Sequence, residues 1–391
     1  MQKGLRMKKC SICKTELETI KDFGKLPLSN ELLDSHETQT KKYRLELAYC
    51  KECELLQLAT KLKSEILFKN DYPYKSGVSQ SFKEHCKTFA ENLIEKTKDK
   101  ESYIILEIGG NDGTLAKEVL KNNSHVYYYI VDPCFPDYWN IDEHPFIIGI
   151  KKLFDKSLFP HLRFDLIIFQ NSFAHLPNPE RVINDCYSLL KKEGEIIIEL
   201  PIAEYTVKNS FWETVYFEHQ YYWSVGSLKK FMLGNNMKLN RINHFEEIQG
   251  GSARFYFSKN ISTGIRHFTN PEKIYPKLQK SILEFEKRRE NLKEFIKNIP
   301  DDYFIVGITA PAKAALLLRL LDKEEIEKIA FLADDTKEKQ GKFLACHNRN
   351  ISIRPFDRIP KNSVLIILSR NYEKVLSEKV KAFEPRVIFC P

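Results

Sequence analysis

The chain has 391 residues, 42% of them hydrophobic, and a formal net charge of +8. This length exceeds one typical folding core, so we expect two or three globular domains rather than a disordered chain. No apolar run approaches the ~18 residues of a membrane span, and residues 1–9 are basic without a hydrophobic stretch. We therefore expect no membrane partner, no signal peptide and a cytoplasmic location.

The positive charge is spread along lysine-rich stretches such as 273–297 and is not gathered into one basic block. This pattern fits a solvated, lysine-rich surface, and it also fits a field that attracts a phosphate-bearing substrate.

Cys10-x-x-Cys13 and Cys50-x-x-Cys53 form two pairs separated by 36 residues. Two such turns supply the four thiolates of a closed, tetrahedral Zn²⁺ site. A redox pair and chance spacing are the alternatives, although no thioredoxin-like βαβ unit follows to support the first. With four thiolates no coordination position stays open, so the ion should stabilise a zinc-binding domain over residues 1–70 and do no chemistry.

Two loops near this domain contain candidate site residues. Residues 23–30 combine apolar and amide side chains and end at Asn30. Residues 70–77 form a Pro/Gly turn with Tyr74 and Ser76, and this turn marks a domain boundary. The tyrosine there is either packed or at the edge of a site.

We expect a helix over residues 79–96. After it come the apolar run 104–108, a glycine turn and an amphipathic segment. These three features indicate the first strand, turn and helix of a doubly wound α/β domain. The turn carries Gly109, Gly110 and Gly113, so the G-x-G-x-x-G spacing of a dinucleotide site fails, and no lysine follows as in a P-loop.

The remaining interpretation of the turn is an S-adenosylmethionine (SAM) site. Glu107 and Asp112 could meet the cationic methionine end of SAM, directly or through water, and Asp132, after the apolar run 126–131, could accept hydrogen bonds from the ribose hydroxyls. The alternative is a glycine loop that binds nothing. Loops at the carboxyl ends of strands are where such folds bind ligands, which favours SAM.

A further strand over residues 164–169 ends in Gln170–His175 at the same expected edge of the sheet. His175 fits a core or capping position as well as a site. A helix over 177–190, a stop at Lys191–Gly194 and a strand over 195–200 continue the alternation, and we place a SAM-dependent methyltransferase domain at 71–262.

Residues 211–224 pack aromatic side chains around Glu218 and His219. Aromatic walls tune pKa values, so His219 could act as a base near neutral pH. Tyr216 could donate to a developing oxyanion, and Glu218 could orient the imidazole or stabilise its charged form. Plain core packing is the alternative. Downstream, the glycine turn 249–254 opens a strand and offers another site edge.

A charged helical stretch over 271–299 leads to a third unit, in which strands over 302–307, 328–333, 363–368 and 386–390 alternate with helices. This alternation predicts a smaller Rossmann-like α/β domain over 263–391. Its first turn has the single glycine Gly307, so we expect no second full cofactor, while Lys313 at a helix start could receive a diphosphate.

Taken together, these motifs resemble the SAM-dependent sugar C-methyltransferases that act on nucleotide-linked 4-keto-deoxyhexoses. The likeness covers nearly the whole chain. It rests on an ordered set of segments: the two cysteine pairs, the 24–30 loop, Tyr74-x-Ser76, Glu107 to Gly113, Asn171 to His175, Tyr216 to His219, Gly250 to Arg254, and Gly307 to Lys313.

The resemblance implies a zinc-binding N-terminal domain, a central SAM-dependent methyltransferase domain and a C-terminal Rossmann-like domain, with the sugar nucleotide between them and methyl transfer most often at C3. We expect a monomer or weak homo-oligomer. The site residues that it implies are, for catalysis, Tyr74, His175, Tyr216, Glu218 and His219; for SAM, Glu107, Gly109, Asn111, Asp112, Gly113, Asp132 and Asn171; for the substrate, Asn30, Ser76, Arg254 and Lys313. Within this set His219 resembles the general base and Tyr216 the group that steadies the enolate.

Three positions depart from the family pattern: Phe217 stands where a histidine is usual, Arg370 where a tryptophan is usual, and Thr309 where a second glycine is usual. Two other functions stay open. One is O- or N-methylation of a related sugar nucleotide. The other is a zinc-stapled, non-catalytic scaffold or nucleic-acid binder, but the aromatics around Tyr216 are not interleaved with Lys/Arg as a base-stacking face would be, so we expect no nucleic-acid partner.

Overall fold

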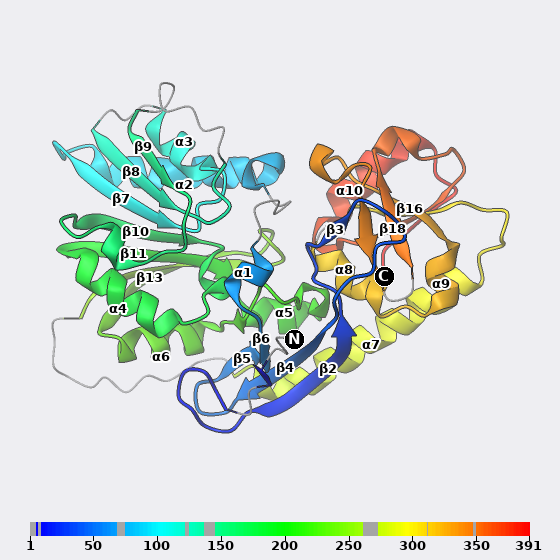
Figure 1. Ribbon diagram of the computed structural model, residues 1–391, viewed down its shortest axis with the longest axis horizontal. Coiled ribbons are helices and arrows are strands. Elements are labelled where there is room, and N and C mark those ends of the chain that lie inside the picture. The colour runs from blue at the N-terminus through cyan, green and yellow to red at the C-terminus, as the bar shows by residue number, and fades with distance from the viewer. Residues whose placement is uncertain are drawn as a thin grey trace.

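The computed structural model describes residues 5–6, 9–68, 75–121, 125–136, 145–260, 273–310, 312–346 and 349–391. These residues form three large sheets and a two-stranded sheet of β1 (Leu5–Arg6) and β6 (Thr60–Lys61), with helices packed beside the central and C-terminal sheets (Figure 1). The mixed α/β class expected from the sequence is confirmed. Among the described residues, none of the helices combines the length and apolar character needed to cross a membrane.

The central sheet has seven strands in the order β13-β14-β11-β10-β7-β8-β9. Neighbouring strands from β11 to β9 are parallel, whereas β14 is antiparallel to both of its neighbours. The bounds are β7 (Tyr103–Ile108), β8 (Val126–Val131), β9 (Ile147–Ile150), β10 (Phe164–Gln170), β11 (Leu190–Pro201), β13 (Met237–Phe245) and β14 (Ser252–Lys259). Because β7 is followed by β8 on one side and lies against β10 on the other, the strand order reverses there and a crevice opens at the carboxyl ends of β7 and β10.

Burial on both faces explains why the inner strands read as continuous apolar runs. Strands β7 and β10 are almost entirely buried, with Leu106 opposite Ile167. The covering helices are α2 (Gln80–Thr97), α3 (Thr114–Leu120), α4 (Pro179–Leu189) and α6 (Val225–Gly234). Helix α4 starts where the sequence signals it, because the Asn178 side chain accepts from the Arg181 amide and a proline fills the first turn.

The N-terminal sheet has the order β12-β5-β4-β2, with β2 (Glu18–Leu26), β4 (Tyr43–Cys50) and β5 (Leu55–Leu58). Its edge strand β12 (Tyr221–Tyr222) comes from the aromatic segment 211–224 and pairs antiparallel with β5. A short helix, α1 (Ser64–Leu67), follows this sheet and lies beside the central unit (Figure 1).

The C-terminal sheet has the order β20-β19-β15-β16-β18-β17-β3. Its own strands and helices are β15 (Ile305–Ile308), β16 (Ile329–Ala333), β17 (Phe343–Ala345), β18 (Asn350–Arg354), β19 (Val364–Ile367), β20 (Val387–Phe389), α8 (Ala312–Arg319), α9 (Lys323–Lys328) and α10 (Glu373–Val380). The edge strand β3 (Leu32–Leu33) belongs to the N-terminal part of the chain and pairs with β17.

Two helices connect the units. Helix α5 (Ala203–Asn209) follows β11, and α7 (Tyr275–Lys297) runs along the lower side of the molecule from the N-terminal sheet to the C-terminal unit (Figure 1). One hydrophobic core joins all three parts, from Leu47 through Trp212 to Leu316. The expected domain boundaries near residues 70 and 262 fall outside the described residues.

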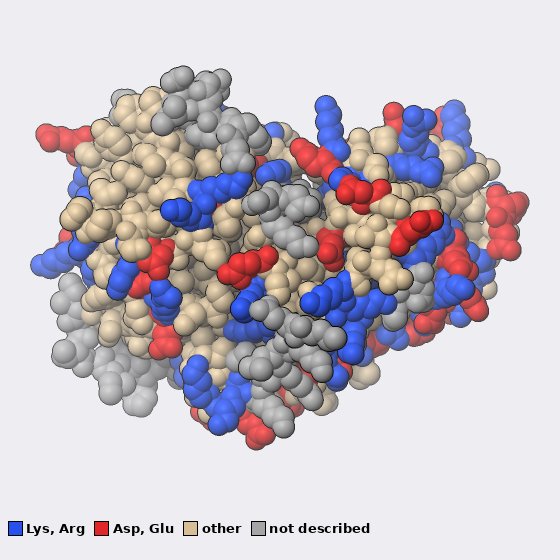
Figure 2. Space-filling model, viewed as in Figure 1, with Lys and Arg blue, Asp and Glu red and all other residues tan. Residues whose placement is uncertain are grey.

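Most elements expected from periodicity are present within a few residues of the expected bounds. The exception is Lys191–Gly194, expected as a helix stop, which belongs to β11 as an irregularity in its pairing with β10. The short strands β3 and β12 had no sequence signal. Figure 2 shows basic and acidic side chains interspersed over one face, in keeping with the dispersed charge of the sequence.

Candidate active site

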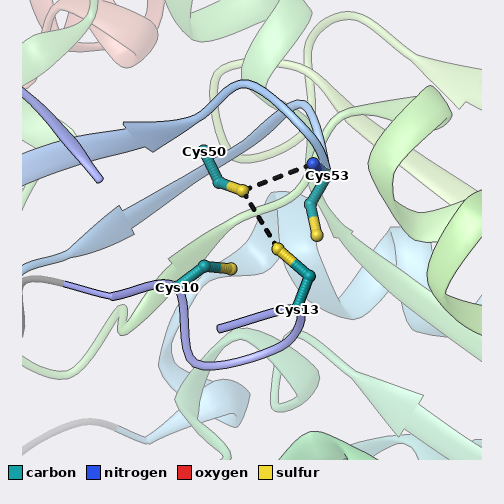
Figure 3. A group of neighbouring side chains, drawn as sticks. All are labelled: Cys10, Cys13, Cys50 and Cys53. Atoms are coloured by element: carbon teal, nitrogen blue, oxygen red, sulfur yellow. Dashed lines mark hydrogen bonds between the residues drawn. The ribbon is translucent and has the colours of Figure 1, made fainter. Parts of the chain in front are cut away.

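The four cysteines of the two pairs lie together, with their sulfur atoms all within 4.8 Å of one another. Figure 3 shows two sulfurs from each turn directed toward a shared centre. A tetrahedron of Zn–S bonds of about 2.3 Å needs sulfurs separated by about 3.8 Å, and Cys13 Sγ lies 3.4 Å from Cys50 Sγ. The donor set therefore fits the structural zinc expected from the sequence.

Backbone geometry shapes both turns in the same way. The residue after each second cysteine, Lys14 and Glu54, adopts a left-handed conformation. The amides of Ile12 and Cys53 donate to the sulfur of the first cysteine in their own pair, at 3.4 and 3.3 Å. Such donors stabilise thiolates, as expected around a metal ion.

The turn after β7 forms the floor of a candidate cofactor site. Gly109 has φ +78°, and a Cβ there would lie 2.4 Å from the Cβ of Ser172. Only glycine permits this approach of the turn to the end of β10. Gly113, also left-handed, starts α3.

A cavity of about 440 Å³ opens beside this turn, at the carboxyl ends of β7 and β10. Six residues predicted as site residues line it: Ser76, Gly109, Asn111, Asp132, Asn171 and His175. Its position is the crevice where doubly wound sheets bind ligands. The structure thus gathers residues that are almost 100 positions apart in the sequence.

Asp132, at the end of β8, is fixed by two backbone donors, the amides of Asn111 at 2.9 Å and Cys134 at 2.6 Å. Burial raises its pKa, and these two hydrogen bonds oppose the rise. A carboxylate oxygen accepts more than one hydrogen bond, so Asp132 keeps acceptor capacity on the cavity side.

Asn171 has φ +56° and lines the cavity directly after β10. Its buried side-chain oxygen and nitrogen have no hydrogen-bond partner among the described residues. Buried polar atoms normally have hydrogen-bond partners. A side-chain amide without a protein partner in a cavity wall therefore fits a site where a polar ligand supplies these hydrogen bonds.

Glu107, Asp112 and Gly113 are not among the residues that line the cavity. Asp112 accepts from the Gly77 amide at 2.9 Å and from the Thr114 hydroxyl at 2.6 Å, which anchors residues 75–78 over the turn. Burial raises the pKa of Glu107 to about 8, although the Tyr128 hydroxyl donates to it at 3.0 Å.

His175 connects the cavity to the aromatic segment. Its ring stacks on Phe68 at 5.6 Å on one side and lies 4.9 Å from the ring of His219 on the other, between centroids. Burial lowers the pKa of His175 to about 4, so the imidazole is neutral near pH 7. Its Nε2 is buried and has no partner among the described residues.

Tyr216 and His219 form a hydrogen-bonded pair. The Tyr216 hydroxyl lies 2.7 Å from His219 Nε2, and the two rings are 4.2 Å apart between centroids. Both residues are buried, at 8% exposure each. A hydroxyl and an imidazole at this distance can exchange a proton with each other and with a substrate bound beside them.

Glu218 is buried on the opposite side of the same turn. Its Oε1 accepts from the Asn30 amide at 2.8 Å, and its Oε2 has no partner among the described residues. Burial raises the pKa of Glu218 to about 6, against hydrogen bonds from its own backbone and from Asn30 that lower it. The sequence prediction that Glu218 orients the imidazole stays a prediction, because its observed partner is Asn30.

Three predicted residues lie away from the cavity or outside the described part. Arg254 is 2% exposed in β14, where its Nε donates to Glu199 at 2.6 Å and its guanidinium lies 3.4 Å from the ring centre of Phe89. Lys313 lies in the first turn of α8, and its side chain is outside the described part. Tyr74 also lies outside the described residues.

The cavity has further lining residues that the motifs did not indicate, among them Phe68, Leu153, Phe154 and Arg181. Phe68 follows α1 of the N-terminal unit, and Arg181 lies on α4. No local pattern marks either residue as a site residue, because only tertiary packing brings them to the crevice.

Comparisons with known proteins agree with this geometry. Residues 10–68 match a zinc binding domain, residues 79–240 a methyltransferase domain, and residues 247–387 a C-methyltransferase C-terminal domain. The three matched regions follow one another along most of the chain. The protein is a SAM-dependent methyltransferase.

The chain is similar to the C-methyltransferase NovU of Streptomyces niveus, with 22% identity over 86% of this chain and 83% of the relative. Among solved structures it is similar to an O-methyltransferase family protein of Burkholderia thailandensis, with a TM-score of 0.35, 13% identity, and 46% of this chain and 60% of that chain covered. Another is CalO1, a methyltransferase in calicheamicin biosynthesis, with a TM-score of 0.34, 11% identity, and 44% and 54% covered. The two structural likenesses are distant and support no conclusion about function.

The cavity fits SAM. Asp132 can receive the ribose hydroxyls, and the orphaned amide of Asn171 can receive the polar methionine end. The glycine turn leaves room for close approach of the ligand. SAM supplies an electrophilic methyl group when bound.

We predict that Cys10→Ser and Cys50→Ser lower the zinc content from about one ion per chain to near zero and lower the melting temperature, because three thiolates no longer close the tetrahedron. Elemental analysis and thermal unfolding measure both effects. Cys390→Ser, at a cysteine outside the cluster, is the control and should leave both unchanged. A stable, zinc-free Cys10→Ser protein would contradict the structural role.

Asn171→Ala should weaken SAM binding about tenfold, because the orphaned amide is then absent from the cavity wall. Isothermal titration calorimetry measures the change. The matched control is Asn362→Ala, since exposed Asn362 has a similar left-handed φ of +63° and lies in the C-terminal unit. Equal affinity in wild type and Asn171→Ala would remove Asn171 from the cofactor site.

Proposed function

We propose that this methyltransferase moves the methyl group of SAM to carbon, at C3, of a nucleotide-activated 4-keto-deoxysugar. His219 acts as the general base and Tyr216 stabilises the enolate. The product would serve a surface polysaccharide or a glycosylated metabolite. The observation that carries the proposal is the hydrogen-bonded Tyr216–His219 pair, 2.7 Å apart, beside the cavity-lining ring of His175.

The chemistry requires both members of this pair. A carbon next to a ketone becomes nucleophilic when its proton is removed, and the negative charge then develops on the ketone oxygen. The His219 imidazole takes that proton, and the Tyr216 hydroxyl donates to the oxygen. The electron pair of the enolate then forms the new carbon–carbon bond as the sulfonium releases its methyl group.

Burial of the pair supports the same roles. Few water molecules reach side chains that are 8% exposed, so a hydroxyl and an imidazole there interact more strongly with a developing charge than they would in water. His175, neutral near pH 7, lines the cofactor cavity, and its ring lies 4.9 Å from that of His219 between centroids, so the pair is next to that cavity.

The nucleotide part of the substrate is assigned to the C-terminal unit. Its open α/β sheet has the carboxyl ends of β15 and β16 available for a ligand, and Asp334 after β16 accepts from the Ala310 amide at 2.8 Å. The match of residues 247–387 to a C-methyltransferase C-terminal domain supports a part for this unit in C-methylation.

His219→Ala should lower kcat by about a hundredfold to ten-thousandfold while the affinity for SAM stays near wild type, because the base is lost and the cofactor cavity is kept. Steady-state kinetics on a panel of 4-keto sugar nucleotides and SAM titration measure both. His125→Ala is the control, since His125 contacts the Thr97 carbonyl at 3.1 Å, outside the cavity wall. Parallel loss of turnover and SAM binding would refute the base assignment.

Activity should fall as the pH drops through about 6, because the Glu218 carboxylate becomes protonated there. The charged form is the one that can stabilise a positively charged His219. The pH profile of kcat/KM measures this acidic limb, and Glu218→Gln should change its position. Glu213→Gln changes another buried glutamate of the same segment and should leave the limb in place. An identical limb in Glu218→Gln would assign it to another group.

A further inference from the structure

Arg319 is a buried cation that hydrogen-bonds to both the N-terminal and the C-terminal unit. It ends α8 and is 2% exposed. Its Nε donates to the Ala345 carbonyl of β17 at 2.8 Å, within its own unit. Its two terminal nitrogens point the other way, to residues 27–29 of the N-terminal unit.

These terminal nitrogens hold what we name the anchored loop, residues 27–30 between β2 and β3. Nη1 donates to the Pro27 carbonyl at 3.0 Å and to the Ser29 hydroxyl at 3.4 Å, and Nη2 donates to the Leu28 carbonyl at 2.9 Å. Leu28 and Ser29 are each 5% exposed. Without the guanidinium, the Pro27 carbonyl and the Ser29 hydroxyl would lose this donor, whereas the Leu28 carbonyl would keep the Glu31 amide at 3.2 Å. A buried polar group left without a partner costs about 1–3 kcal/mol.

The anchored loop ends at Asn30, whose amide donates to Glu218 at 2.8 Å. Glu218 directly precedes His219 in the chain. A continuous path of hydrogen bonds and covalent bonds therefore runs from the C-terminal unit through the anchored loop to the Tyr216–His219 pair.

We propose that Arg319 is a positioning residue of the methyl-transfer site, which sets the place of Glu218 by holding the anchored loop and Asn30. This inference rests on the proposed role of Glu218 next to the base. Arg319 touches neither the cofactor cavity nor the Tyr216–His219 pair, so it acts only through other residues.

The charge of Arg319 adds a second effect. It favours the Glu218 carboxylate and lowers the pKa of that group, against the larger effect of burial. The other titratable groups around these two residues are Cys346 and Glu31 near Arg319, Tyr222 of β12 and the adjacent His219. Among the described residues, Arg319 is the cation whose charge lowers the pKa of Glu218, so its removal should raise that pKa.

Two substitutions separate position from charge. Arg319→Lys keeps a cation and loses the planar fork that reaches both carbonyls, so kcat should fall on the order of tenfold while the acidic limb of the pH profile stays in place. Arg319→Gln removes the charge as well, so the limb should also move to higher pH. Affinity for SAM should stay at the wild-type value in both.

A double-mutant cycle tests the path. In a Glu218→Gln background, Arg319→Lys should cost no further kcat, because the residue it positions is already altered. Lys342→Gln is the matched control, since Lys342 pairs with Asp34 across the same junction at its exposed edge and should leave kcat unchanged. Additive losses, or wild-type kcat in Arg319→Lys, would overturn the proposal.

A second measurement separates this inference from the proposed function. The titration of Glu218, followed by ¹³C NMR of glutamate-labelled protein and assigned with Glu218→Gln, needs no substrate. The Glu218 titration should move to higher pH in Arg319→Gln and remain at the wild-type pH in Arg319→Lys. An unchanged titration in Arg319→Gln would refute the electrostatic link, whereas a shifted titration in a protein that methylates no 4-keto sugar would refute the proposed substrate alone.

Discussion

Two short antiparallel pairings tie the three parts of the chain together, and the position of the Tyr216–His219 pair depends on them. Strand β12, directly after His219, pairs with β5 of the zinc-stapled sheet, and β3, directly after the anchored loop, pairs with β17 of the C-terminal sheet. Trp212 adds a third attachment through its indole nitrogen, 2.9 Å from the Ser281 hydroxyl of α7. The aromatic segment 211–224 is therefore fixed by contacts with all three units.

Through these pairings, a metal ion at the cysteine cluster would also stabilise the aromatic segment 211–224, which it does not contact. The four sulfurs close the turns that precede β2 and β5, and Gln57 of β5 donates to Cys10 Sγ at 3.2 Å. Strand β5 is in turn the partner of β12, so order at the cysteine cluster and order at the aromatic segment 211–224 are connected through one strand. The ion stabilises the sheet on which the site is built and needs no open coordination position to matter for catalysis.

The features that could be predicted from the sequence are those that a few adjacent residues determine. The cysteine spacing, the glycine turn after β7 and the apolar runs of the central sheet each follow from a few adjacent residues, and the structure places them as expected. Contacts that depend on distant parts of the chain could not be predicted in this way. Arg254 was predicted at a site edge from its glycine turn, yet its side chain binds Glu199 on the neighbouring strand β11. Arg319 had no motif at all, because the carbonyls it binds are almost 300 positions away.

The central claim is that carbon is the nucleophile and His219 makes it so. The most direct measurement is hydrogen–deuterium exchange at the carbon beside the ketone of a 4-keto sugar nucleotide, in D₂O, with S-adenosylhomocysteine in place of SAM. Exchange by the wild-type enzyme that is lost in His219→Ala is the result this account predicts. Methyl transfer by an enzyme that catalyses no exchange at that carbon, with the methyl group found on oxygen or nitrogen, would contradict it.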